Sequence, residues 1–471
     1  MFASCKRSLL SPVPQTSITD ATAFDTPARV AQQVLSLYGA LKSGTFFGGR
    51  AQIAGDIRGE DFINKTTNLV TGADVWQLNC TGTSTNFVKN MWGQAYFVIN
   101  LCNLFIDGMA TKGTSVVGAS LSNNYLGEAR YVRALTYYWL LQFYARPFAD
   151  GSGSKPGLPL RLTGIKSSGF SDLARSTVAE VYAQIVSDLN FAEANLPLTY
   201  STALLYTTHA HRNTAIALKT RVYLTMQNYA SVITEANKIV SASAPFTATT
   251  GVNHALLSNI VNVFRSPYTA TESILSMPMT TTAGDNPGTQ NQLGYYWSRT
   301  PTGAGNGEFS LNTTTGIVAD AGWLPSDARR SFNAVVSGKT YVNTKYNAPS
   351  PFTDYAPIMR YSEVMLNLAE ALARTNAGVD ARAVALLNAV RQRSDATVTF
   401  APASQAALIS AILNERRIEF LGEGLRSVDL MRLLQTIPAK GSIPAKGPSE
   451  SGYIWPISAD EMALNHLMTD N

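Results

Sequence analysis

Apolar residues recur at helical spacing through most of the chain and predict a mainly α-helical protein. Asp25-Thr26-Pro27 supplies a helix start, with proline at an early position. The apolar period predicts N-terminal helices over about 27–43, 85–109, 123–144, 176–195 and 211–242, the last with a break at Gln227-Asn228. The period returns over about 361–372, 381–393, 405–421 and 425–434.

Several of these helices are paired like helical hairpins. The run 215–224 turns at Asn228 into the run 229–236, and small and large apolar residues alternate along both. This pattern is typical of tetratricopeptide-like repeats, in which antiparallel helices interlock. The segments 361–372 and 381–393, with a turn at 376–378, show the same alternation of small and large apolar residues. We therefore expect tetratricopeptide-like helical hairpins that form one body.

The middle of the chain has a different character. Residues 245–357 are rich in Gly, Pro, Thr and Asn, carry several aromatic residues and show little helical period. Loops of this length inside an ordered body are usually functional. We divide the chain into a tether (1–26), a helical part (27–244), a loop-rich variable ligand-binding region (245–357) and C-terminal hairpins with a closing segment (358–471).

Charge and hydropathy exclude two classes of protein. Only 15% of the 471 residues are charged, and 37 Lys+Arg are scattered among 32 Asp+Glu, for a net charge of +5. The chain has no basic run, so we expect no nucleic-acid partner. It also lacks the roughly 18 consecutive apolar residues of a membrane-spanning helix.

Metal and redox motifs are also missing. His209 and His211 lie two residues apart without a carboxylate immediately beside them, so we expect no metal and no cofactor. The three cysteines have no metal-ligand spacing, and Cys80 and Cys102 are compatible with either a bridge or two free thiols.

Standard catalytic motifs fail as well. Gly338-Lys339-Thr340 resembles the end of a phosphate-binding loop, but Asn333 stands where that loop needs its first glycine. The sequence has neither a GxSxG elbow nor an HExxH helix. We expect a protein that is not an enzyme. A glycosidase stays open as an alternative, because two carboxylates distant in sequence leave no spacing signature.

One long segment carries a specific resemblance. Residues 414–433 read NERRIEFLGEGLRSVDLMRL, which is similar to the ERR-E-F-EG-R-DL-R signature of the SusD/RagB family. These are outer-membrane lipoproteins of Bacteroidetes that capture nutrients at the cell surface. Further segments match in the same order, at 14–19, 128–134, 360–364, 387–391 and 455–465.

The resemblance implies an anchor and a partner. Met1-Phe2-Ala3-Ser4-Cys5 resembles the end of a lipoprotein signal, so Cys5 is expected to be lipidated and to hold the chain at the outer surface of the outer membrane. Family members sit on a TonB-dependent outer-membrane transporter of the SusC type, and this is the partner we expect.

Aromatic residues outside the helices are candidates for ligand contact, because the apolar faces of sugar rings stack on flat side chains. We select Trp76 first, then Tyr295, Tyr296, Trp297 and Trp323 in the middle region. Trp92, Trp139 and Trp455 fall on framework positions and are assigned to the core.

Charged residues receive a structural interpretation. Asp56, Glu60 and Asp61 are expected in a solvated loop, with hydrogen bonding to the ligand as the alternative. In the signature, Glu423 with Arg426 and Asp429 with Arg432 are spaced as i,i+3 pairs that link helical turns.

The resemblance implies a cell-surface glycan-binding lipoprotein that delivers oligosaccharides to a SusC-type transporter. Three alternatives remain: a peptide-binding protein like those of the RagB branch, a glycoside hydrolase, and a tetratricopeptide-like scaffold for protein partners alone.

Overall fold

The computed structural model of the chain describes residues 22–167 and 169–471, and Cys5 lies outside these ranges. Helices dominate, as expected. Their bounds are α1 Pro27–Leu41, α2 Arg50–Ile57, α3 Ala73–Trp76, α4 Asn90–Gly108, α5 Thr114–Val117, α6 Ala119–Tyr144, α7 Val178–Asn195, α8 Ala203–Thr208, α9 Arg212–Thr225, α10 Tyr229–Ala236, α11 Leu293–Trp297, α12 Tyr361–Thr375, α13 Ala381–Ser394, α14 Gln405–Glu419, α15 Arg426–Arg432 and α16 Ala459–Leu464.

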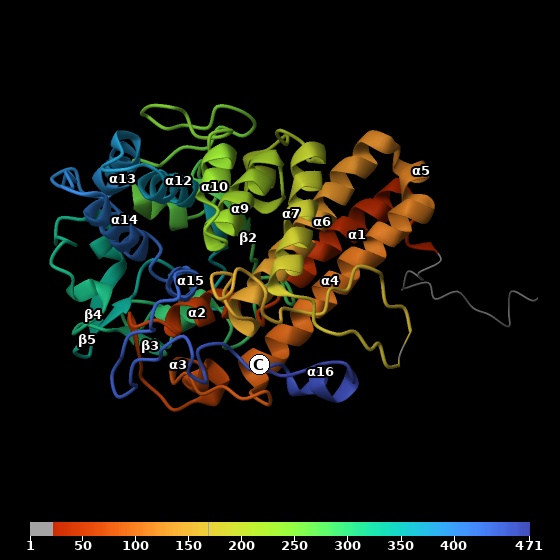
Figure 1. Cartoon of the computed structure of the whole chain (residues 1–471), viewed down its shortest axis with the longest axis horizontal. Helices are drawn as coiled ribbons and strands as arrows, with labels where there is room; N and C mark the ends of the chain where they lie inside the picture. The colour runs from red at the N-terminus through yellow and green to blue at the C-terminus, as the bar shows by residue number, and fades with distance from the viewer. Residues whose placement is uncertain (1–21, 168) are drawn as a thin grey trace, which may run out of the picture.

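The helices pack as the hairpins that the sequence predicts. Helices α1, α4, α6 and α7 lie side by side at one end of the molecule, and α9, α10, α12, α13 and α14 gather towards the other (Figure 1). Successive pairs α6–α7, α9–α10 and α12–α13 are in contact, and α7 packs on α9 to continue the array. No helix within the described ranges is long and apolar enough to cross a membrane.

Three small antiparallel sheets accompany the helices. They pair β1 (Phe62–Asn64) with β3 (Phe309–Leu311), β2 (Ser273–Met277) with β6 (Ala356–Arg360), and β4 (Asn333–Val336) with β5 (Lys339–Val342). In the first sheet Phe62 is opposite Leu311, so this sheet ties the N-terminal part to the middle region.

One large hydrophobic core, accompanied by two small clusters, draws residues from the N-terminal, middle and C-terminal parts of the described chain. It extends from Val30 to Met468 and includes Trp92, Trp139 and Trp455, each at most 3% exposed. The assignment of these three tryptophans to the core is confirmed. Residues of the middle region belong to the same core, so the chain forms one body. Cys80 and Cys102 are free thiols.

Buried ion pairs replace the solvated loop expected at residues 56–61, so that expectation was wrong. Helix α2 is fully buried, and Asp56, Glu60 and Asp61 are each at most 3% exposed. Arg417 pairs with Asp61 through two contacts of 2.9 Å from Nε, and Arg426 donates from Nε to Glu60 at 3.0 Å. The arginines of the signature segment stabilise the carboxylates of Glu60 and Asp61, which are distant in sequence, whereas Asp56 accepts hydrogen bonds from the backbone N–H groups of Gly424 and Arg426.

One of the two expected i,i+3 pairs forms. Arg432 Nε lies 2.9 Å from Asp429, whereas Glu423 pairs with Arg360 and Lys345, both at 2.7 Å. Burial opposes the charge of Glu423, but Arg360 and Lys345 hold the pKa of this carboxyl below its usual value. The signature therefore has the structural role that was expected, through partners outside the segment.

Candidate functional site

An open polar cleft lies where β3 and β5 meet the C-terminal loop, on the side of the molecule labelled β3, β4 and β5 in Figure 1. Its volume is about 420 Å³, within the range of small-molecule sites. Its walls combine apolar surface with the hydroxyl groups of a serine and four threonines and the ammonium group of an exposed lysine. The lining residues are Ile63, Ser310, Leu311, Asn312, Thr313, Thr314, Thr315, Gly338, Lys339, Thr340, Ala439, Lys440 and Gly441, which we call the β3–β5 cleft.

The hydroxyl-bearing wall is held in shape by one amide side chain. Asn312 Oδ1 accepts hydrogen bonds from the backbone N–H groups of Thr314 (3.1 Å) and Thr315 (3.2 Å). Its Nδ2 donates to the carbonyl of Glu60 at 2.8 Å and to the hydroxyl of Thr315 at 2.8 Å. Asn312 is buried, while Thr313, Thr314 and Thr315 are exposed. This wall is therefore a fixed turn that presents three threonines to solvent.

The opposite wall rests on a buried lysine. Lys440 Nζ donates to the carbonyls of Arg58 (2.9 Å) and Gly59 (3.0 Å), just beyond the end of α2, and also to that of Ile57. Cations are stabilised near the C-terminus of a helix, where carbonyl groups lack helical partners. This contact fixes the 439–441 segment against α2.

Trp76, the first predicted ligand contact, lies behind this wall. Its indole N–H donates to the carbonyl of Phe62 at 2.8 Å, and the ring is 7% exposed. Lys440 Nζ lies 5.6 Å from the ring centroid. A Cβ added at Gly441 would meet the ring at 3.4 Å. Trp76 thus supports the cleft wall, and its contact with a ligand stays a prediction.

The three aromatic residues of α11 differ in exposure. Tyr295 is half-buried, and its hydroxyl accepts from Asn306 Nδ2 at 3.5 Å. Tyr296 and Trp297 are fully buried, and Trp297 stacks on Phe62 at 4.3 Å between ring centroids. Of the three, only Tyr295 is accessible to a ligand without rearrangement of the core.

Trp323 is also in the interior. It is 2% exposed, and the guanidinium of Arg330 covers its ring at 4.1 Å. In this structure Tyr296, Trp297 and Trp323 have packing roles. Ligand contact by them stays a prediction that would need the middle region to open.

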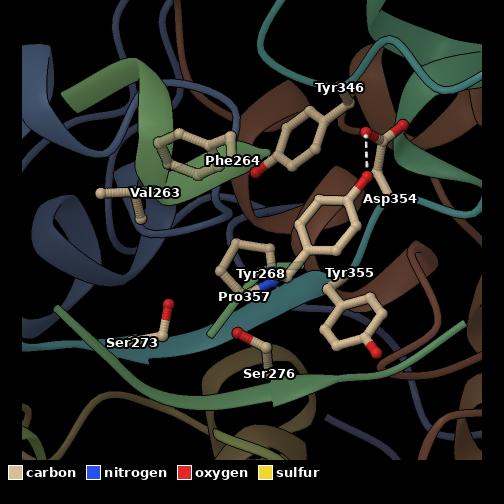
Figure 2. Close-up of a pocket in the computed structure, with 9 residues that line it drawn as sticks. All are labelled: Val263, Phe264, Tyr268, Ser273, Ser276, Tyr346, Asp354, Tyr355 and Pro357. Carbon is tan, nitrogen blue, oxygen red and sulfur yellow. Dashed lines mark hydrogen bonds between the residues drawn. The ribbon is translucent and has the colours of Figure 1, made fainter. Parts of the chain in front are cut away.

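A second hollow lies over the β2–β6 sheet but is too small for a sugar ring. Figure 2 shows it between the hydroxyls of Ser273 and Ser276 and the ring of Tyr268, which donates to Asp354 at 3.2 Å. Tyr355 stacks on Tyr268 at 4.5 Å. The cavity volume is about 10 Å³, room for one water molecule. The β3–β5 cleft, with about 420 Å³, is therefore the candidate ligand site.

The aromatic residues predicted as ligand contacts do not line the cleft, and of its lining residues only Gly338-Lys339-Thr340 stood out in the sequence, as a motif that lacks the glycine of a phosphate-binding loop. A signal was present in the run Asn312-Thr313-Thr314-Thr315, a cluster of hydrogen-bonding groups in a segment without helical period. Lys440 had no comparable signal, because only the fold brings β5 and the C-terminal loop together.

Two family models together match nearly the whole chain. The model described as "SusD family" matches residues 221–471. The model described as "Starch-binding associating with outer membrane" matches residues 13–224.

Individual relatives agree with these matches. SusD-like protein P2 of Formosa agariphila is 26% identical over 514 residues, covering 95% of this chain and 93% of the relative. A SusD superfamily protein from Bacteroides fragilis superposes with a TM-score of 0.84 at 31% identity, covering 95% of this chain and all of the other. Surface glycan-binding protein A from Bacteroides thetaiotaomicron, solved with laminarihexaose, has the same fold, with a TM-score of 0.75 at 16% identity over 95% of this chain and 99% of its own.

Proposed function

The chain belongs to the SusD family, and from this premise we propose that it captures oligosaccharides at the cell surface in the β3–β5 cleft. The observation that carries the proposal is the wall of exposed hydroxyls at Thr313, Thr314 and Thr315, held by Asn312 beside an open volume of about 420 Å³. Hydrogen bonds to such hydroxyl groups are a common means of binding sugars. A half-buried aromatic residue, Tyr295, contacts Asn306, just before strand β3.

Binding without hydrolysis is part of the proposal. Glycoside hydrolysis generally uses a pair of carboxyl groups on either side of the scissile bond. Among the described residues that line the cleft there is no aspartate or glutamate. Incubation with the bound oligosaccharide and analysis of the products tests this point, because release of shorter sugars would contradict it.

The partner and the anchor follow from the family. We propose that the loaded protein delivers its ligand to a SusC-type TonB-dependent transporter and that lipidation of Cys5 holds it at the outer membrane. Co-purification of the transporter with the tagged full-length chain supports the first point. For the second, Cys5→Ser should move the protein into the soluble fraction, and unchanged membrane retention would contradict the anchor.

Filling the cleft tests the proposed site. Thr314→Trp places a large side chain in the cleft, and we expect it to abolish retention on polysaccharide gels and heat release in calorimetry with a panel of purified oligosaccharides. Thr234→Trp, on the exposed side of α10, is the matched control and should bind like the unmodified chain. Equal binding by both variants would exclude the cleft. Displacement of bound sugar by peptides would favour the RagB-like alternative.

A further inference from the structure

Two cations converge on one backbone carbonyl beside the β3–β5 cleft. Lys65 Nζ and Arg299 Nη1 both donate to the carbonyl of Asn306, at 3.0 and 2.7 Å. Both side chains are half-buried and so retain access to solvent. Within the described part of the chain, neither has a carboxylate oxygen within 4 Å. Like charges are thus held close together without an ion-pair partner.

A third cation extends this cluster into the cleft. Lys339 is exposed, lines the cleft from β5 and has no ion-pair partner among the described residues. Burial lowers the pKa of Lys65, and the charges of Arg299 and Lys339 lower it further. Arg299 and Lys339 each lie near enough to Lys65 for their charges to oppose its own, and we call Lys65, Arg299 and Lys339 the cation cluster.

The carboxylate nearest in effect to this cluster, Glu308, already accepts hydrogen bonds from other side chains. Glu308 favours the charged form of Lys65, but it is 2% exposed. Its Oε2 accepts from the hydroxyls of Thr66 (3.3 Å) and Thr71 (2.9 Å), and its Oε1 accepts from the amide of Asn306. Glu308 thus holds Thr66, Thr71 and Asn306 in place. It leaves the N–H groups of Lys65 and Arg299 that do not bind Asn306 or the neighbouring carbonyl free for a ligand.

The cleft has charge of one sign. Among the described residues that line it, Lys339 carries an exposed charge and there is no carboxylate, whereas the ammonium group of Lys440 is buried against the carbonyls at the end of α2. A concave site lined by one sign of charge focuses the field and attracts ligands of the opposite sign. An anionic group would relieve the repulsion within the cluster, and a planar guanidinium can bind a carboxylate or sulfate with two hydrogen bonds.

We propose that the β3–β5 cleft selects acidic glycans and that the cation cluster binds their carboxylate or sulfate groups. This rests on the proposed glycan-binding function and adds the chemical class of the ligand. Hydroxyls of the 313–315 turn would form hydrogen bonds to the sugar. Lys65, Arg299 and Lys339 would bind its carboxylate or sulfate groups.

Matched ligand pairs test the proposal. Calorimetry compares a uronic-acid oligosaccharide with its carboxyl-reduced form, and a sulfated oligosaccharide with its desulfated form, so that the two pairs distinguish carboxylate from sulfate. We expect at least tenfold tighter binding of one charged member, and a fall in that affinity between low and high salt because ions screen exposed charges. Equal affinity within both pairs, without salt dependence, would overturn the proposal.

Variants locate the effect. Lys339→Gln, at an exposed position, should weaken binding of the charged ligand about two- to fivefold. Arg299→Gln should weaken it about tenfold, and Arg299→Lys should retain part of the preference. Lys155→Gln removes an exposed lysine outside the cleft and serves as the control. Loss of preference in Lys155→Gln, or none in Lys339→Gln and Arg299→Gln, would contradict the cluster.

The two proposals fail in different ways. If neutral sugars bind and Thr314→Trp abolishes their binding, glycan capture stands while selection by charge falls. If no member of either pair binds, the proposed function itself fails.

Discussion

Arg221 and Glu363 form a two-pronged ion pair inside the protein: Nε donates to Oε1 at 2.7 Å and Nη2 to Oε2 at 2.6 Å. Both side chains are at most 4% exposed. The pair joins α9 to α12, elements that are 142 residues apart in the chain at this contact. It therefore connects the N-terminal hairpins to the C-terminal ones.

Breaking this pair should be costly. Arg221→Met leaves the carboxylate of Glu363 buried without its partner, and we expect the free energy of unfolding to fall by about 3–5 kcal/mol, as measured by urea denaturation. Lys89→Met, which breaks a partly exposed pair with Asp460, should cost at most about 1 kcal/mol. The double variant Arg221→Met/Glu363→Met should recover part of the loss. Stability of Arg221→Met equal to that of the unmodified chain would contradict this role.

Trp297 should behave as a core residue. Trp297→Ala removes a fully buried ring that stacks on Phe62, and we expect a loss of about 3–5 kcal/mol of stability. Trp297→Phe keeps an aromatic ring and should lose less. The measurement is the melting temperature together with glycan affinity. Weakened binding at an unchanged melting temperature would show instead that this ring contacts the ligand.

Lys440 should stabilise both α2 and the cleft wall. Lys440→Met removes the donor to the carbonyls of Ile57, Arg58 and Gly59, and we expect a loss of about 3 kcal/mol. Because the 439–441 segment loses its attachment, glycan affinity should fall as well. Lys446→Met, at a half-buried position of the same loop, is the control. Equal denaturation curves for both variants would refute the anchoring role.

Asp56 should make stability depend on pH. Burial raises its pKa from 3.8 to about 7, with a further contribution from Asp61, although the N–H groups of Gly424 and Arg426 and the charge of Lys345 favour the carboxylate. Between about pH 4 and pH 7 the folded state keeps a proton that the unfolded state has lost. The contribution of Asp56 to the free energy of unfolding should therefore fall by about 4 kcal/mol at most as the pH rises across this window.

Comparison with Asp56→Asn isolates this effect. The informative quantity is the difference in slope of unfolding free energy against pH, because the amide nitrogen cannot accept both backbone hydrogen bonds and absolute stability will fall. Other carboxyls titrate in both proteins and cancel in the difference. Identical slopes from pH 4 to pH 7 would show that Asp56 has an ordinary pKa.

Most of the helical body was predictable, because one apolar face repeats along each long helix. The expected helix over 381–393 is α13, and the expected break at Gln227-Asn228 separates α9 from α10. Helix α2 was missed because all eight of its residues are buried, including Arg50, Gln52 and Asp56, so it has no polar face to produce a period. Burial of Asp61 depends on Arg417, 356 residues away, which local sequence cannot reveal.

The candidate site was less predictable. Composition marked residues 245–357 as different, and two of the cleft's four wall segments, 310–315 and 338–340, do come from this region. It did not tell which aromatic residues face solvent: Tyr295 is half-buried, while its neighbours Tyr296 and Trp297 are in the core. Helix α11 has only five residues and no polar face that repeats along it. Tertiary packing therefore decides which of its aromatic side chains are exposed.

The cleft is assembled from four separate stretches of chain, at Ile63, 310–315, 338–340 and 439–441. The last of these follows the C-terminal hairpins in the chain, so a chain truncated before Ala439 would keep the N-terminal hairpins but lack one wall of the cleft. If the cleft is the capture site that we propose, ligand binding would require the fold to be complete through Gly441. Binding activity would then report on the integrity of the whole fold, whereas helical content alone would not.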